Sequence, residues 1–192
     1  MRFAKICWSG GSILINVTIA IYIYLQSKAP ALLADRLSYV NENWGIYGSH
    51  WKAEFLIMTL IAVGAFYFAV CLRKVEWVII TTGQFILLFT YPVMIGGYHN
   101  ASLEVGIVVN QIATFTFVFG NMIFLTGLLY LYGTDTILKS AIRYASLAIT
   151  VIPLITFFII FIDIISWDEA VVVAPLINCL YLINAFYGYK LT

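Results

Sequence analysis

The side chains best suited to chemistry in this 192-residue chain are its two histidines and the carboxylates beside its apolar stretches. Imidazole and carboxylate groups are competent ligands for divalent cations, so a metal site is the first hypothesis to consider. The candidates are His50, His99, Glu54, Glu104, Asp163, Asp168 and Glu169. No pair among them has the ligand spacing HxxxH or HExxH, and we therefore expect solvated loop ends without a bound metal.

A row of polar side chains marks the fourth apolar stretch. Asn110, Thr114 and Asn121 follow one another at i, i+4 and i+11, which places them within about 40° of each other around an α-helix. In a membrane such side chains hydrogen-bond between helices, and each bond contributes about 0.6–2 kcal/mol. We expect this stripe to be a helix-contact surface, and a pore lining is the alternative.

The motifs that identify common enzyme classes are missing from the sequence. The chain has no GxSxG, P-loop or GxGxxG sequence, and its three cysteines form no CxxC pair. We expect no cofactor and no enzyme activity, although a lipid-modifying enzyme with scattered active-site residues stays open. An ion-coupled transporter needs ionisable groups inside the membrane, and we expect none near the middle of a span. This absence argues against a proton-coupled carrier.

The composition indicates which elements must position these residues. Hydrophobic residues make up 63% of the chain and charged residues 10%, against roughly 45–50% and 25% in soluble domains. Six continuous apolar stretches each approach the ~20 residues with which a helix crosses a bilayer. They are residues 6–25, 55–72, 78–98, 105–132, 145–162 and 171–189. The sequence predicts an all-α, polytopic membrane helix bundle with about six transmembrane helices, in a single transmembrane domain, 1–192.

The charge of the chain bears on its partners. The formal net charge is only +1, and no basic stripe of the kind that binds phosphate backbones is present. We expect the lipid bilayer as the main partner and no direct binding of nucleic acid.

The longest connection between the expected spans is residues 26–54. Leu32, Leu33, Leu37 and Val40 fall near helical spacing, which predicts a short amphipathic helix at the outer surface. The segments 43–45 and 47–49 that follow, each with a glycine, are expected to break it. The loop also holds four aromatic residues of the kind that forms an interfacial belt. These are Tyr39, Trp44, Tyr47 and Trp51. An outward-facing lid or recognition surface is the alternative interpretation.

Lysine and arginine are distributed unequally between the two sides of the expected bundle. The side with both termini carries seven of them: Arg2, Lys5, Arg73, Lys74, Lys139, Arg143 and Lys190. The other side carries three, all in the loop 26–54. Because cytoplasmic loops hold the excess of cations, both termini are expected in the cytoplasm, with the first span retained as a signal anchor.

Two of the cations on the expected cytoplasmic side lie one helical turn apart. Lys139 and Arg143 could form a basic cytoplasmic face that attracts anionic lipid. Simple anchoring of the connection explains them as well, and it is the interpretation that we favour.

The size of the chain, its short cytoplasmic ends, its long first outer loop and its lack of catalytic groups resemble the membrane subunit of Kiwa-type bacterial anti-phage systems. This resemblance implies an oligomeric inner-membrane sensor that holds a cytoplasmic effector and responds to phage attack. The run FLTGLLYLYG at 124–133 is also similar to segments of bacterial multi-pass proteins. We therefore expect a non-catalytic, homo-oligomeric membrane subunit that senses at its outer face and anchors a cytoplasmic partner. The alternative is a small-solute transporter or channel.

Overall fold

The computed structural model describes residues 1–166 and 173–191, and this part of the chain contains seven α-helices and no strand. The helices are α1 (Arg2–Gln26), α2 (Leu33–Glu42), α3 (Trp44–Leu72), α4 (Val75–Gly97), α5 (Leu103–Thr134), α6 (Ser140–Phe161) and α8 (Ala174–Lys190). The predicted all-α class is confirmed. Asp168, Glu169 and the first two residues of the predicted sixth span lie outside the described residues.

Five of the described helices are long and apolar enough to cross a membrane: α1, α3, α4, α5 and α6. The shortest of them has 22 residues, or about 33 Å at 1.5 Å per residue, and the hydrocarbon core is ~30 Å thick. These helices identify a multi-pass membrane protein. The helix α8 corresponds to the predicted sixth span, and its 17 residues cover about 26 Å.

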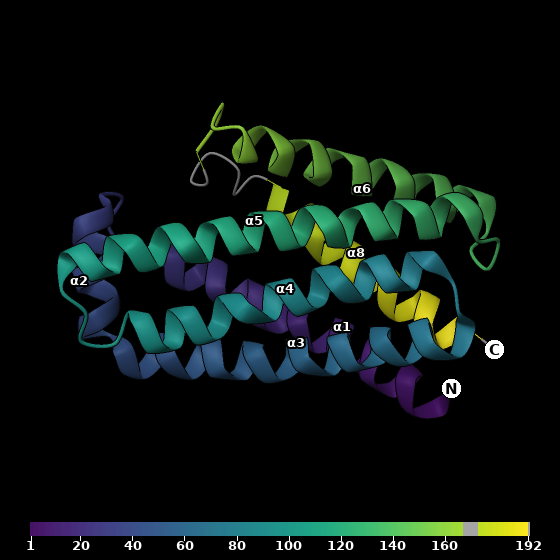
Figure 1. Cartoon of the computed structure of the whole chain (residues 1–192), viewed down its shortest axis with the longest axis horizontal. Coiled ribbons are helices and arrows are strands. Elements are labelled where there is room, and N and C mark those ends of the chain that lie inside the picture. Colours follow the sequence, from purple (N-terminus) through teal and green to yellow (C-terminus); the bar gives the residue numbers. More distant parts are fainter. Residues whose placement is uncertain (167–172, 192) are drawn as a thin grey trace.

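The long helices lie side by side as a bundle, with α2 across one end and both marked chain ends at the other (Figure 1). We call these the outer end and the inner end, after the orientation that the sequence predicts. Each long helix contacts the next in the order α1, α3, α4, α5, α6 and α8, and α8 contacts α1 again. The helices therefore form a closed ring, which α8 completes.

Glycines allow two pairs of neighbouring helices to touch through their backbones. Gly83 of α4 lies so close to α5 that a Cβ atom there would be 2.7 Å from Cα of Phe124 and 2.9 Å from the carbonyl oxygen of Gly120. Gly64 of α3 lies equally close to α1, where a Cβ atom would be 2.6 Å from the backbone nitrogen of Trp8. Small residues promote such close packing in membranes. These two contacts hold α4 against α5 and α3 against α1.

The structure corrects the predicted end of the outer loop. α2 ends at Glu42, where the predicted break begins, but α3 starts at Trp44 and continues through Gly45 and Gly48, which were predicted to lie in that break. A glycine costs a helix about 1 kcal/mol, whereas the burial of one large aromatic side chain from these turns contributes about 2 kcal/mol or more. Packing therefore outweighs helix propensity. Within the rest of the predicted loop, α2 buries Leu37 and Val40.

Candidate functional site

The early start of α3 places a histidine and a glutamate inside a membrane-spanning helix. His50 and Glu54 are one turn apart, and Nε2 of His50 lies 3.6 Å from Oε2 of Glu54. The two side chains are only 5% and 11% exposed. Glu54 follows Trp44 by ten residues, or about 15 Å along the helix axis. The sequence-based expectation that Glu54 ends the loop 26–54 is therefore wrong, because Glu54 belongs to a helix long enough to cross a membrane.

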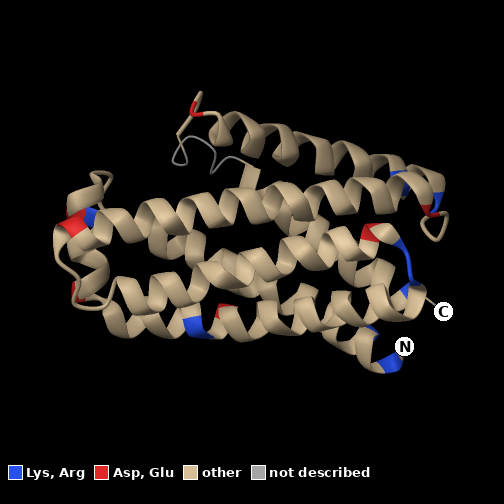
Figure 2. Ribbon diagram, in the orientation of Figure 1, with Lys and Arg blue, Asp and Glu red and all other residues tan. Residues whose placement is uncertain are grey.

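The charged residues of the protein gather mainly at the two ends of the bundle, and α3 is the exception (Figure 2). Lys52 and Glu54 lie part-way along α3, but they point to different surroundings. Lys52 is exposed and Glu54 is buried. The helix therefore turns its acidic group into the bundle and leaves its basic group outside.

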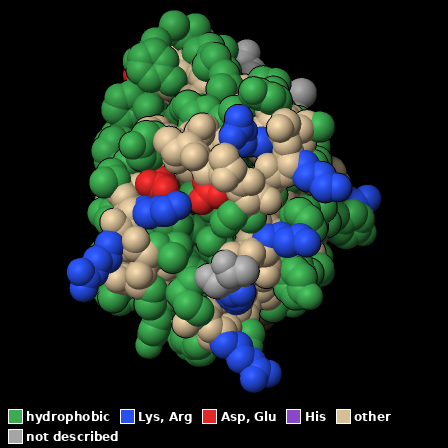
Figure 3. Space-filling view, turned by 90° about the vertical axis from the view of Figure 1, so that its right-hand side faces the viewer, with side chains coloured by type: hydrophobic (Ala, Val, Ile, Leu, Met, Phe, Trp, Pro, Cys, Tyr) green, Lys and Arg blue, Asp and Glu red, His purple; other side chains and the backbone are tan. Residues whose placement is uncertain are grey.

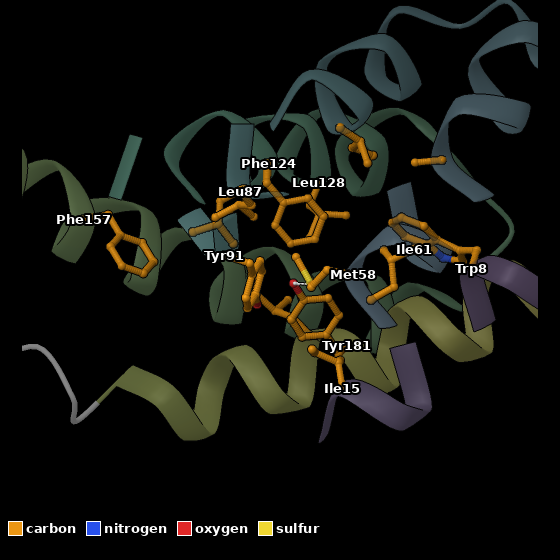
Figure 4. Packing of buried hydrophobic residues seen from close by; sticks show 14 of the residues in the cluster. Trp8, Ile15, Met58, Ile61, Leu87, Tyr91, Phe124, Leu128, Phe157 and Tyr181 are labelled. Atoms are coloured by element: carbon orange, nitrogen blue, oxygen red, sulfur yellow. Dashed lines mark hydrogen bonds between the residues drawn. The ribbon is translucent and has the colours of Figure 1, made fainter. Parts of the chain in front are cut away.

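Three further helices place tyrosines around Glu54. Tyr22 of α1 stacks on His50, with ring centroids 6.0 Å apart and ring planes 12° apart. Tyr91 of α4 and Tyr181 of α8 interact electrostatically with the Glu54 carboxyl group. Figure 4 shows Tyr91 and Tyr181 beside Met58, with the Tyr181 hydroxyl group 3.8 Å from the Met58 sulfur. We call Tyr22, His50, Glu54, Tyr91 and Tyr181 the Glu54 cluster.

The Glu54 carboxyl group has no fixed cation as its partner in the described part of the chain. Its ion pair is with His50, whose charge depends on protonation. A buried carboxylate costs several kcal/mol in lost hydration unless it is paired. Its charge must therefore be neutralised by a proton on Glu54, by a proton on His50, or by a bound cation. The pair can take up and release positive charge within the bundle.

Buried polar groups without hydrogen-bond partners lie next to this cluster. The Gln84 side chain of α4 is fully buried, and neither of its amide atoms makes a hydrogen bond of acceptable geometry with described residues, although the Tyr181 hydroxyl group lies beside it. One turn away, the Thr81 hydroxyl group is also buried and unpaired. More than about 90% of buried polar groups in proteins are hydrogen-bonded. Gln84 therefore places a buried amide group next to Tyr181 of the Glu54 cluster, and Thr81 places a buried hydroxyl group one turn further along α4.

A different arrangement holds the charges at the inner end. The Tyr187 hydroxyl group donates a 2.7 Å hydrogen bond to Oδ2 of Asp135, which also lies 3.1 Å from Nζ of Lys74. Lys74 is 3.8 Å from the Glu76 carboxylate. Burial favours the neutral acid, but hydrogen bonds from Tyr187, from the backbone of Ile137 and from Lys74 outweigh it and lower the pKa of Asp135. We call Lys74, Glu76, Asp135 and Tyr187 the inner charged cluster.

Helix α8 connects the two clusters through Asn184. The Tyr132 hydroxyl group of α5 donates a hydrogen bond to Oδ1 of Asn184, and the indole nitrogen of Trp8 donates a 2.8 Å bond to its backbone carbonyl. Asn184 is fully buried. Asn184 thus joins α8 to α1 and α5, and it lies three residues from both Tyr181 and Tyr187 along α8.

The predicted stripe on α5 does not meet the Glu54 cluster. Oδ1 of Asn110 accepts a 2.9 Å hydrogen bond from the hydroxyl group of Tyr98, whose pKa is raised to about 12 by burial. Asn121 is buried and donates a 2.9 Å bond to the carbonyl of Phe117 in its own helix. Thr114 is half-buried between them. Two of the three side chains are thus bound within the chain itself.

The predicted aromatic loop residues pack at the outer end. Tyr47 and Trp51 belong to α3 and are 1% and 3% exposed, so they are core residues and not parts of an exposed loop. The Tyr47 hydroxyl group donates a 3.1 Å hydrogen bond to the carbonyl of Leu25 at the end of α1. Tyr39 and Trp44 are half-buried beside them, with Tyr39 against Tyr47 and Trp44 against Trp51.

The predicted basic pair lies where α6 begins, at the inner end. Lys139 is exposed and precedes the first turn of the helix. Arg143 is half-buried, and its guanidinium group lies 5.4 Å from the ring centroid of Tyr144. Figure 3 shows the inner end with several lysine and arginine side chains around a pair of acidic ones.

Sequence reasoning missed most of the Glu54 cluster. The spacing of His50 and Glu54, four residues apart next to a long apolar run, could have indicated that the helix starts earlier. Tyr91, Tyr181 and Gln84 carried no signal, because isolated polar residues in separate spans do not reveal that they meet.

Comparisons with known proteins add no further constraint. No family model, no curated protein and no solved structure matches this chain. Among the described residues, no three histidine, cysteine or acidic side chains gather closely enough to hold a metal ion.

Proposed function

We propose that this protein carries a small solute or ion across the membrane and that the Glu54 cluster is its binding site. The observation that carries this proposal is a buried carboxyl group inside a ring of membrane helices, whose ion-pair partner among the described residues is a histidine and not a fixed cation. An ionisable residue within a membrane is costly, and where it occurs it commonly belongs to a transport pathway or a proton relay.

A comparison within the same protein supports a functional role over a structural one. Asp135 has Lys74 as a fixed partner and a hydrogen bond from Tyr187. Glu54 has no fixed cation among the described residues, and its partners are His50 and the Thr18 side chain of α1. A carboxyl group that served only to hold helices together would be stabilised in the way that Asp135 is. Glu54 is left able to change its charge.

The topology that we propose has six spans, with α8 as the sixth and both termini in the cytoplasm of a bacterial inner membrane. Three observations support it: α8 completes the ring, both marked chain ends lie at one end of the bundle, and that end is rich in lysine and arginine (Figures 1 and 3). Cytoplasmic loops carry the excess of basic residues.

Transport can be tested with the purified protein in liposomes that contain a pH-sensitive dye. With a pH gradient imposed, we expect uptake of at least one solute from a panel of labelled ions, sugars and amino acids. Glu54→Gln should reduce this uptake about tenfold or more, because it removes the ionisable group. The matched control is Glu104→Gln, at an exposed position in the first turn of α5, which should leave uptake unchanged. The proposal fails if no solute or ion moves, or if Glu54→Gln is as active as wild type.

The second candidate function is a homo-oligomeric sensor that anchors a cytoplasmic effector, as in Kiwa-type defence. Two surfaces favour it: the basic inner end, and an outer pocket between α2 and the α4–α5 connection that Asp35, Asn41 and Asn100 help to line. Purification in mild detergent with mass measurement tests this function. A strict monomer without a bound cytoplasmic protein would exclude it.

A further inference from the structure

The inward faces of α4 and α8 oppose each other between the two clusters. At the outer side of this stretch the Tyr181 hydroxyl group lies beside Gln84. At its inner side the rings of Trp77 and Tyr187 are 6.2 Å apart. The two helices run in opposite directions, since α4 starts at the inner end and α8 finishes there. Thr81 and Asn184 therefore lie at the same level, between these two contacts.

The polar side chains of this stretch are deeply buried and under-paired. Gln84 and Asn184 are 0% exposed and Thr81 is 7% exposed. Hydrogen-bond partners are missing for Oγ1 of Thr81 and for Nδ2 of Asn184 among the described residues, and the Gln84 amide group has the Tyr181 hydroxyl group beside it but no hydrogen bond of good geometry. Each unpaired buried group costs about 1–3 kcal/mol. Three such side chains in one line lower the stability of the fold, so their presence needs another reason.

The row formed by Gln84, Thr81 and Asn184 has a titratable group at each of its two ends. Its outer end is Tyr181, in the Glu54 cluster, and its inner end is the 2.7 Å hydrogen bond between Tyr187 and Asp135. Tyr181 and Tyr187 are six residues apart in α8, or about 9 Å along the axis, with Asn184 halfway. Asn184 is therefore one turn or less from each tyrosine along the helix. We call Tyr181, Gln84, Thr81, Asn184 and Tyr187 the polar path.

We propose that protons travel along this polar path between Glu54 and Asp135. The inference rests on the proposed function and identifies the ion that moves. A proton leaves the Glu54 carboxyl group, each hydroxyl group or water along the path accepts one proton and passes another on, and the Asp135 carboxylate receives the last. The relay groups return to their original protonation state. Gln84, Thr81 and Asn184 hold and orient the water, because amide groups are poor proton carriers.

Two substitutions interrupt the path. Thr81→Val replaces an unpaired hydroxyl group by a methyl group of similar shape, and we expect an equal or higher melting temperature. Gln84→Leu removes the amide group beside the Tyr181 hydroxyl group, and it is compared with Thr81→Val for that reason. Thr82→Val is the matched control, since Thr82 is the next residue of α4, is exposed and donates a hydrogen bond to the Val78 carbonyl.

The assay measures proton entry into liposomes under an imposed membrane potential. The internal dye reports the protons, and solute uptake is measured in the same liposomes.

The expected result is proton entry in wild type and Thr82→Val, with a decrease of about tenfold or more in Thr81→Val and Gln84→Leu. Equal proton entry in Thr81→Val, Gln84→Leu and wild type would overturn the path. Solute uptake that depends on Glu54 but moves no proton would overturn the proton as the ion, while the proposed transport function would stand. If neither protons nor solutes move, both proposals fail.

Discussion

The Tyr187 hydroxyl group and Oδ2 of Asp135 are 2.7 Å apart, and this hydrogen bond ties α8 to the end of α5. Lys74, from the connection between α3 and α4, reaches the same oxygen at 3.1 Å. A single carboxylate thus joins three parts of the ring at the inner end.

Removing the Tyr187 hydroxyl group should weaken the fold at neutral pH. A hydrogen bond to a charged group contributes about 1.5–3 kcal/mol, so Tyr187→Phe should lower the free energy of unfolding by this amount. Chemical unfolding in mild detergent measures the change. Tyr189→Phe, two residues further along α8 at a 75% exposed position, should have no effect.

The loss should also depend on pH in a defined direction. The pKa of Asp135 is lowered in the folded protein, so its contribution is complete above the ordinary carboxyl pKa of about 4 and is lost as the pH falls through the folded value. The difference between wild type and Tyr187→Phe should therefore shrink below about pH 4. A difference that is the same at pH 7 and at low pH would show that Asp135 is not the partner that matters.

The contact between α4 and α5 predicts opposite effects for two glycines of the same helix. Gly83→Ala would place a Cβ atom 2.7 Å from Cα of Phe124, where backbone atoms cannot give way, and overpacking of this kind costs about 1–3 kcal/mol. Gly96→Ala meets no atom within 4 Å and should stabilise the helix by about 0.5–1 kcal/mol. Thermal unfolding of both variants checks the prediction. Equal effects of the two changes would contradict the close approach of α4 and α5.

The proposed orientation predicts which connections can be labelled from outside the cell. In a variant with its three cysteines replaced, Asn100→Cys in the α4–α5 connection should react with an impermeant maleimide in intact cells. Thr136→Cys in the α5–α6 connection, at the basic inner end, should react only after permeabilisation, because basic connections stay in the cytoplasm. The reverse pattern would place both termini outside.

The sequence was sufficient for the helical class because continuous apolar runs leave few alternatives to membrane helices. It was insufficient for the start of α3. His50, Lys52 and Glu54 interrupt the apolar run there, and the glycines at 45 and 48 resemble loop residues. Only contacts with other helices, such as Tyr22 stacking on His50, decide that the turn is helical and buried. The same limit applies to Gln84 and Tyr181, which meet only when the ring closes.

The position of α8 in the chain has a consequence for biosynthesis. This helix leaves the ribosome after the six other described helices, yet it supplies Tyr181, Asn184 and Tyr187 and completes the ring between α6 and α1. Until it inserts, Trp8 lacks its hydrogen bond to Asn184 and the Asp135 carboxylate lacks Tyr187. Chains that stop before α8 would therefore leave the ring open between α6 and α1, with Trp8 and Asp135 without these partners.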